Sequence, residues 1–144
     1  MDIDLRKAAL TLAGWKAGQE TEYGLLWELR SPSGRGWRNG RDYWYSEEQV
    51  WENAPAVEDD IQLALRFLPI SPLIVVRIDY HTLGPTIQFV QRAVYTEGGG
   101  IKAIPDRSIC HGYPPIEALA AKYCQLWMFY KDQESKIEAI NHHI

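Results

Sequence analysis

The sequence predicts an α+β fold in which a single antiparallel β-sheet packs against helices. Three observations lead to this class: an amphipathic segment at the start, two β-branched runs around a short turn, and a long amphipathic segment near the end. The 144 residues show no internal repeat or linker, and one domain commonly spans about 100 to 200 residues. We therefore expect a single α+β domain over residues 1–144, with an N-terminal helix and a long C-terminal amphipathic helix.

The first part of the chain predicts two helices and a strand. Apolar residues recur at helical spacing between Asp4, which can cap a helix, and Gly14, which can end it. Alternating apolar residues over positions 23–29 predict a strand with one apolar face. Ser46 and Gln49 have the spacing of a capping box, so we expect a short helix to begin there.

A third helix and a β-hairpin follow. Residues 57–68 place apolar side chains on one helical face and are followed by proline. Residues 73–80 and 86–95 are rich in β-branched side chains and flank a turn, so we expect two paired strands. A glycine run at 98–100 should make another tight connection, and residues 101–104 are a candidate for a short further strand.

Pro114 and Pro115 open the strongest helical pattern in the chain. From Lys131 the sequence is polar, and residues 131–144 either continue this helix or fray at its end. We expect the apolar stripe of the helix to be buried within one chain or across a two-fold axis. The stripe consists of six residues, of which the last three are large and aromatic: Ile116, Leu119, Ala120, Tyr123, Trp127 and Tyr130.

Charge and composition argue against several classes of function. A net charge of −4 at pH 7 disfavours binding of long nucleic acid, because that binding depends on neutralising many phosphates. The longest apolar run, at 73–76, is too short to span a membrane. Residues 1–20 are charged and lack a signal-peptide pattern, and two cysteines do not make a disulfide framework. We therefore expect a cytoplasmic protein with reduced thiols.

No residue pattern predicts an enzyme. Cys110 and His111 have the chemistry of a nucleophile and a base, but adjacent residues usually point apart and no third group is placed to orient them. The cysteines and histidines lack the short paired spacing of structural zinc sites. The glycines match no phosphate-loop or dinucleotide pattern. We therefore expect no catalysis, no metal and no cofactor, and we interpret Cys110 and His111 as loop residues.

The most unusual part of the sequence is residues 30–45, which we call the Arg/Trp segment. Its guanidinium groups match phosphate geometry, and its aromatic rings can stack on a base, so the segment suits a nucleotide-sized anion. Two alternatives stay open: an exposed loop whose tryptophans pack on the sheet, and a protein interface. The segment interleaves four arginines with aromatic residues: Arg30, Arg35, Trp37, Arg38, Arg41, Tyr43, Trp44 and Tyr45.

A second group of candidates surrounds the expected hairpin. Arg77 interrupts an apolar run, and its simplest interpretation is an outward-facing strand residue. If Arg77 faced a pocket instead, it would need an anionic partner. The group lies on the two strands and in the loop expected before the last helix: Arg77, Tyr80, Phe89, Arg92, Arg107, His111 and Tyr113.

Three short stretches of the sequence occur in an informative order. They are the helical start at 4–10, Tyr45-Ser46 at the opening of a helical segment, and residues 113–120, which lead from the hairpin into an alanine-containing helix. In this order they resemble small phage proteins with an α-β-α sandwich domain of uncharacterised function. The sequence departs from that pattern in residues 30–44 and in the aromatic residues 127–130.

Basic aromatic pockets also occur in small phage counter-defence proteins, such as anti-Thoeris proteins that sequester cyclic ADP-ribose-type signals. This resemblance implies a non-enzymatic homo-oligomer in the host cytoplasm that holds a small phosphorylated nucleotide between aromatic faces and arginines. The alternative is a phage accessory or inhibitor protein that acts through protein–protein contacts of the Arg/Trp segment. For the nucleotide ligand we expect a site formed by Arg35, Trp37, Arg38, Arg41, Tyr43, Trp44, Phe89, Arg92, Arg107 and His111.

Overall fold

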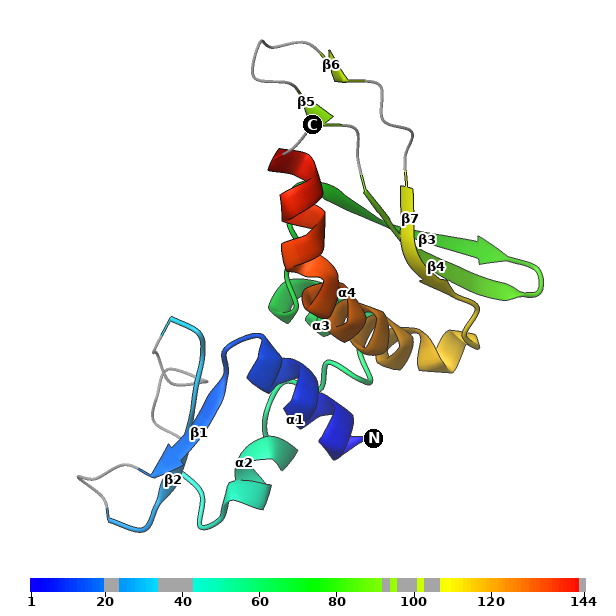
Figure 1. Cartoon of the computed structure of the whole chain (residues 1–144). Helices are drawn as coiled ribbons and strands as arrows, with labels where there is room; N and C mark the ends of the chain where they lie inside the picture. Colours follow the sequence, from blue (N-terminus) through cyan, green and yellow to red (C-terminus); the bar gives the residue numbers. More distant parts are fainter. Residues whose placement is uncertain (20–23, 34–42, 92–93, 96–100, 103–106, 143–144) are drawn as a thin grey trace. The chain divides into compact units, whose positions relative to one another are not determined.

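Helices and antiparallel strands follow one another in separate groups along the chain, which confirms the α+β class. The computed structural model describes residues 1–19, 24–33, 43–91, 94–95, 101–102 and 107–142. The chain divides into two compact units, Met1–Pro69 and Ile70–Ile144 (Figure 1). That the whole chain forms one domain stays a prediction.

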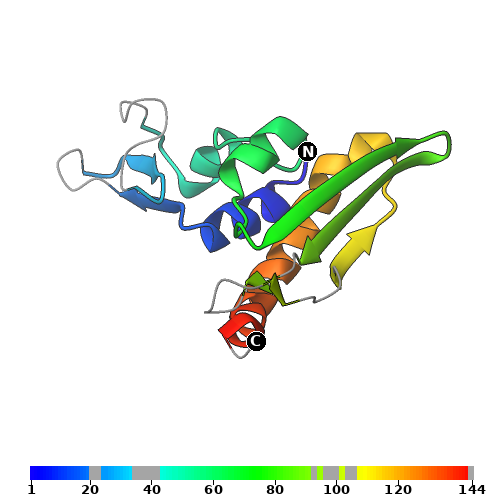
Figure 2. The same ribbon diagram turned by 90° about the horizontal axis from the view of Figure 1, so that it is seen from above.

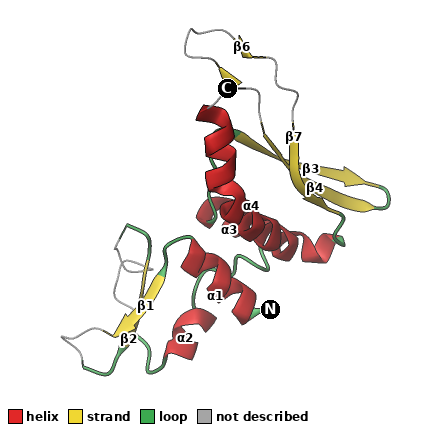
Figure 3. Cartoon of the chain, viewed as in Figure 1, coloured by secondary structure: helices red, strands yellow, loops and turns green. Residues whose placement is uncertain are grey.

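The strands form separate antiparallel sheets rather than the single sheet expected from the sequence (Figure 3). In the described residues, β1 (Lys16–Gln19) pairs with β2 (Trp27–Arg30), and β5 (Val94–Tyr95) pairs with β6 (Ile101–Lys102). A further sheet consists of β3 (Ile74–His81), β4 (Gly84–Gln91) and β7 (Arg107–Gly112), in the order β3-β4-β7. The single sheet does not form because the ladder between β1 and β2 closes inside the first unit, and no described ladder joins it to a strand of the second.

The first helix is α1 (Ile3–Leu12), and its N-cap lies two residues before the expected cap, Asp4. Asp2 is the N-cap, and its side chain accepts a hydrogen bond from the Leu5 amide at 3.0 Å. The prediction that Asp4 caps this helix is therefore wrong. Asp4 lies in the first turn instead, where an acidic side chain complements the positive end of the helix dipole.

Gly14 ends α1, as the sequence predicts. Its φ of 103° is a left-handed conformation that glycine adopts without a steric penalty. The amide of Trp15 bonds back to the carbonyl of Leu10 at 2.9 Å, which is the Schellman arrangement of a helix C-terminus. Trp15 then packs edge-on against Phe67, with ring centroids 5.5 Å apart.

Two further helices complete the first unit. The N-cap of α2 (Glu47–Glu52) is Ser46, whose hydroxyl accepts from the Gln49 amide at 3.2 Å, which confirms the predicted start. The next helix, α3 (Ile61–Phe67), is shorter than expected, because Asp60 caps it and accepts from the amide of the second helical residue.

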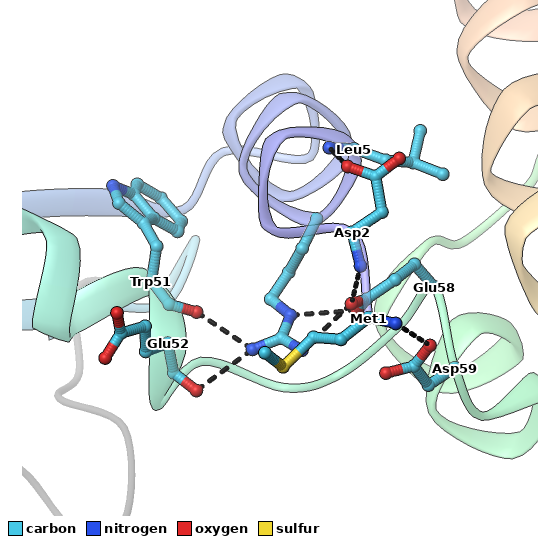
Figure 4. Close-up of polar contacts among 8 residues, drawn as sticks. Met1, Asp2, Leu5, Trp51, Glu52, Glu58 and Asp59 are labelled. Atoms are coloured by element: carbon cyan, nitrogen blue, oxygen red, sulfur yellow. Dashed lines mark hydrogen bonds and ion pairs between the residues drawn. The ribbon is translucent and has the colours of Figure 1, made fainter.

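A buried arginine, Arg6, joins three segments of the first unit, and Figure 4 labels its partners Trp51, Glu52 and Glu58. Arg6 bonds the Glu58 carboxylate through Nε at 2.8 Å and Nη2 at 2.9 Å, and both side chains are almost completely buried. Its Nη1 donates to the carbonyl oxygens of Trp51 and Glu52, each at 3.0 Å. These carbonyls belong to the last turn of α2, where backbone acceptors lack helical partners. Arg6 therefore links α1, the end of α2 and the turn before α3.

Folding keeps the Glu58 carboxylate charged. Burial acts to raise the pKa of Glu58, but the hydrogen bonds and charge of Arg6, with backbone hydrogen bonds from Asp2 and Glu58, outweigh burial and hold the pKa below 4.5. A carboxyl group whose pKa is lowered by folding stabilises the protein above its unfolded pKa. That contribution is lost as the pH falls through the folded pKa.

The second unit is built on the three-stranded sheet. The expected hairpin is formed by β3 (Ile74–His81) and β4 (Gly84–Gln91), and β7 (Arg107–Gly112) pairs with the other side of β4. The strand β7 corrects the prediction from the sequence, in which these residues belong to a loop before the last helix. A register shift between Phe89 and Val90 breaks the two-residue alternation along this ladder, which explains why the β7 sequence shows no clear strand pattern.

The long C-terminal helix, α4 (Leu119–His142), packs against β4 and β7 and lies along one face of the sheet (Figure 2). Phe89 of β4 lies against Tyr123 and Tyr130, with ring centroids 5.5 and 5.9 Å apart. Ile116 lies in the 3-10 turn η2 (Ile116–Ala118) and is exposed. The rest of the predicted stripe is confirmed as buried: Leu119, Ala120, Tyr123, Trp127 and Tyr130.

The register assigns each side chain of the sheet to one of two faces, because directly paired residues share a face. The thiol of Cys110 contacts the backbone of α4, so its row faces the helix: Val76, Phe89 and Cys110. The adjacent row lies on the opposite side, which we call the open face: Arg77, Gln88 and His111. Arg77 is exposed there, which confirms its interpretation as an outward-facing residue.

We predict that Glu58→Gln lowers the free energy of unfolding at pH 7 by about 3–5 kcal/mol, because it leaves the Arg6 charge buried without a counter-ion. Urea unfolding followed by circular dichroism measures this loss. The difference in free energy of unfolding between the wild-type protein and Glu58→Gln should shrink as the pH falls below 4.5. Below that pH the wild-type carboxyl group becomes protonated and loses the charge that the variant lacks.

Lys7→Ala is the matched control. It removes an ion pair that also connects α1 with α2, but the 3.3 Å contact between Lys7 and Glu47 is exposed. We expect this control to cost less than about 1 kcal/mol. Two results would contradict the assigned role of Glu58. One is an equal loss of unfolding free energy in the two variants, and the other is a difference between wild type and Glu58→Gln that does not shrink as the pH falls below 4.5.

Candidate ligand-binding site

The Arg/Trp segment is described only at its two ends. Arg35, Trp37, Arg38 and Arg41 lie outside the described residues, so their contacts with a ligand stay predictions. At the second end, the amide and carbonyl groups of Trp44 bond to those of Trp27 in β2, at 2.8 and 2.7 Å. This bridge makes the backbone at Trp44 extended, and it returns the end of the segment to β2, the strand from which the segment leaves.

The side chains at these ends are partly engaged by the protein itself. Arg30 forms an ion pair with Glu28 of the same strand, so one of the four arginines has an acidic partner that lies just outside the segment. Tyr43 and Trp44 are half-buried. They therefore offer a ligand only part of their surface, whereas Tyr45 is 84% exposed.

The remaining sequence-predicted site residues fall in different places. Phe89 is fully buried against the tyrosines of α4, which does not fit the expected contact with a ligand. Arg92 lies outside the described residues. Arg107 begins β7, where its backbone pairs with Gln91. His111 is exposed on the open face and belongs to the pocket described below.

Cys110 and His111 point to opposite sides of β7. The Cys110 thiol donates to the Leu126 carbonyl of α4 at 3.8 Å, whereas His111 lies on the open face. Burial raises the pKa of Cys110 to about 11, although the positive charge of Lys122 acts in the opposite direction. The thiol is therefore protonated at neutral pH and is not placed to exchange a proton with its neighbour.

A hollow of about 310 Å³ on the open face brings His111 together with polar side chains of β4 and β7. The rings of His111 and Tyr113 meet edge to face, with centroids 5.7 Å apart. Gln88 is the cross-strand partner of His111, so the two side chains are neighbours on the open face. The hollow is lined by two aromatic rings, an amide, two hydroxyl groups and strand backbone: Thr86, Ile87, Gln88, Ser108, His111, Gly112 and Tyr113.

A second hollow, of about 240 Å³, shares Tyr113 with the first. Lys122 supplies its cation, and in the described part of the chain the Lys122 ammonium group makes no ion pair. The Lys122 side chain lies across Gly112, where an added Cβ would collide with it. The other walls come from the turn before α4 and from its first turns: Pro114, Pro115, Ala118, Ala121 and Gln125. We call the two hollows together the Tyr113 site.

Sequence reasoning named His111 and Tyr113 but missed Gln88 and Lys122. Gln88 has the pattern of an ordinary outward strand residue, and it becomes significant only through its pairing with His111. Lys122 borders the apolar stripe of α4, and folding alone brings it onto Gly112. The available signal was Tyr113 directly before two prolines, because prolines restrict the backbone and help to hold an aromatic ring at the surface.

Comparisons of the chain with protein-family models, with curated proteins and with solved structures found no match. In the described ranges, no group of three or more His, Cys, Asp or Glu side chains is placed to hold a metal ion. Among the helices that the structure describes, none has the length and apolar character needed to cross a bilayer. The function must therefore be inferred from the geometry of the Tyr113 site.

We predict that native Cys110 reacts with iodoacetamide at pH 8 about 100-fold more slowly than an ordinary thiol, because a pKa of about 11 instead of 9.0 reduces the thiolate fraction by about that factor. Peptide mapping by mass spectrometry over time measures the rate, with the urea-unfolded chain as reference. His111→Ala should leave the rate unchanged. Rapid labelling of Cys110 that depends on His111 would show instead that the two residues act together.

Proposed function

We propose that the chain binds a small phosphorylated nucleotide at the Tyr113 site and holds it without breaking a bond. One observation carries the proposal: Tyr113 is shared by two hollows, of which one contains Gln88 and His111 and the other contains Lys122. A nucleotide needs three kinds of contact, namely an aromatic surface for the base, polar groups for the base edge and a cation for the phosphate.

The first hollow suits the base. Tyr113 is 76% exposed, so its ring surface is accessible for stacking, which needs no particular base. The amide of Gln88 both donates and accepts hydrogen bonds, and the hydroxyl groups of Thr86 and Ser108 do the same. Its volume of about 310 Å³ lies at the lower end of the range of roughly 300–1,000 Å³ that is usual for small-molecule pockets.

The second hollow suits the phosphate. Lys122 is half-buried there, and a lysine ammonium group binds phosphate as a compact point charge. The charge of Lys122 can attract an anion although the chain as a whole has a net charge of −4.

Sequestration is favoured over catalysis because the thiol next to the site is turned away from it. Cys110 contacts the backbone of α4, and its raised pKa keeps it protonated. A cyclic ADP-ribose isomer, the signal implied by the resemblance to phage counter-defence proteins, is the first ligand to test. In that role the protein would retain the signal in the host cytoplasm and release it unchanged on unfolding.

A thermal-shift screen against cyclic and linear nucleotides, including cyclic ADP-ribose isomers, tests the proposal. A ligand that binds only the folded protein stabilises it by about 2.7 kcal/mol at a concentration 100-fold above its Kd, so we expect Tm to rise by several degrees. Tyr113→Ala and Lys122→Met should each remove most of this shift. Nucleotide recovered after heat denaturation should have an unchanged mass and chromatographic retention.

Tyr45→Ala is the control, because it removes another exposed tyrosine from outside the Tyr113 site. Its shift should match that of the wild-type protein. A shift that Trp37→Ala and Arg38→Ala abolish, and that Tyr113→Ala leaves intact, would move the site to the Arg/Trp segment. An altered ligand would indicate an enzyme, and no shift with any nucleotide would reject the proposal in favour of a protein partner.

A further inference from the structure

The strand β3 forms an edge of the sheet in the second unit. In the described residues it pairs with β4 alone, because the strand order is β3-β4-β7. It is eight residues long, contains no proline, and keeps one register with β4 over its whole length. A long, regular edge presents backbone N–H and C=O groups that can pair with another strand, and proteins usually block or occupy such an edge.

The hairpin geometry shows which backbone groups of β3 are available. A two-residue turn joins His81 to its partner Gly84, and in such a hairpin the residues that flank the turn form a hydrogen-bonded pair. Every second residue before His81 therefore directs its N–H and C=O groups toward β4. The residues between them direct these groups to the outer edge of β3: Val76, Ile78 and Tyr80.

We propose that this edge binds the same edge of a second copy of the chain, antiparallel, about a two-fold axis at Ile78. In this register Ile78 lies opposite itself. Arg77, an exposed cation of the open face, lies opposite the exposed Asp79 of the second copy. By symmetry, Asp79 of the first copy lies opposite Arg77 of the second, so the interface contains two such pairs. Opposite charges that face each other directly across two strands stabilise their pairing.

Charge also selects this register over the adjacent ones. A two-fold axis at Arg77 would place two arginines opposite each other, and an axis at Asp79 would do the same with two aspartates. Like charges directly opposite each other destabilise a strand pair. The two charged residues therefore favour one alignment of the edges and disfavour the alignment on either side of it.

The other face of β3 fits the same register. Val76, Ile78 and Tyr80 share the side on which Phe89 packs against α4. The first two are half-buried and Tyr80 is 65% exposed, so apolar surface remains to be covered. In the proposed dimer, each Tyr80 lies opposite a Val76 and the two Ile78 side chains meet, which are favourable aromatic and β-branched pairs.

The resulting dimer has one continuous sheet with the order β7-β4-β3-β3-β4-β7. Because β3 and β7 are opposite edges of each three-stranded sheet, the Tyr113 sites lie at the two ends of the dimer sheet. The interface itself contains no residue of those sites. Dimer formation and nucleotide binding are therefore tested independently.

Sedimentation velocity over a concentration series, using the full chain, tests the interface. The wild-type protein should sediment as a dimer, and Arg77→Glu and Asp79→Arg should each weaken dimerisation by about tenfold or more, because each variant opposes like charges at two points. The decisive step is to mix the two variants. In the proposed register, the new glutamate at position 77 of one chain lies opposite the new arginine at position 79 of the other chain. Asp79 of the first chain lies opposite Arg77 of the second, so both pairs carry opposite charges and the mixture should form a heterodimer.

Glu117→Lys, at an exposed position outside the interface, controls for the change in net charge and should leave the dimer intact. Ile78→Pro removes an N–H group that points to the outer edge, so it should give a folded monomer, which circular dichroism checks. A wild-type monomer at every concentration would overturn the proposal. It would also be overturned by a dimer that tolerates both charge reversals, or by two monomeric variants that do not associate when mixed.

Discussion

The contact of Phe89 with the tyrosines of α4 determines which face of the second unit can bind a ligand. Phe89 is fully buried, 5.5 and 5.9 Å from the rings of Tyr123 and Tyr130. Adjacent residues of a strand point to opposite faces, so this contact turns Gln88 outward, and pairing with β7 extends the same arrangement to His111. A slip of one residue would bury Gln88 and expose Phe89, which the loss of apolar burial disfavours.

The helix can place tyrosines in this core because their polar atoms are accommodated. The Tyr130 hydroxyl accepts a hydrogen bond from the Ser71 amide at 2.9 Å and donates to the Glu134 carboxylate at 3.2 Å. Burial raises the pKa of Tyr123 above its ordinary value, so that hydroxyl stays neutral. The residue before Tyr123 is Lys122, which lies across Gly112. The helix therefore closes one face of the sheet and also supplies the cation of the second hollow.

Local patterns in the sequence predicted the elements that depend on nearby residues. Gly14 at the end of α1, the Ser46 cap of α2, the β3–β4 hairpin and the stripe of α4 were all predicted. The strands β1 and β7 were missed, because their pairing depends on a partner strand more than on their own composition. Nor did the sequence indicate the burial of Arg6, whose partner Glu58 is 52 positions away. The candidate site was predicted only in part for the same reason, since its missed residues, Gln88 and Lys122, come from β4 and α4.

An NMR titration of the isotope-labelled chain with ADP-ribose and its cyclic isomers can locate nucleotide binding at the Tyr113 site, because it reports on every residue at once. We expect chemical-shift changes centred on the Tyr113 site, at Gln88, His111, Tyr113 and the Lys122 side chain. The Phe89 ring, which lies behind the sheet, should change little. Changes confined to residues 30–45, or the absence of any change at saturating nucleotide, would contradict binding at this site.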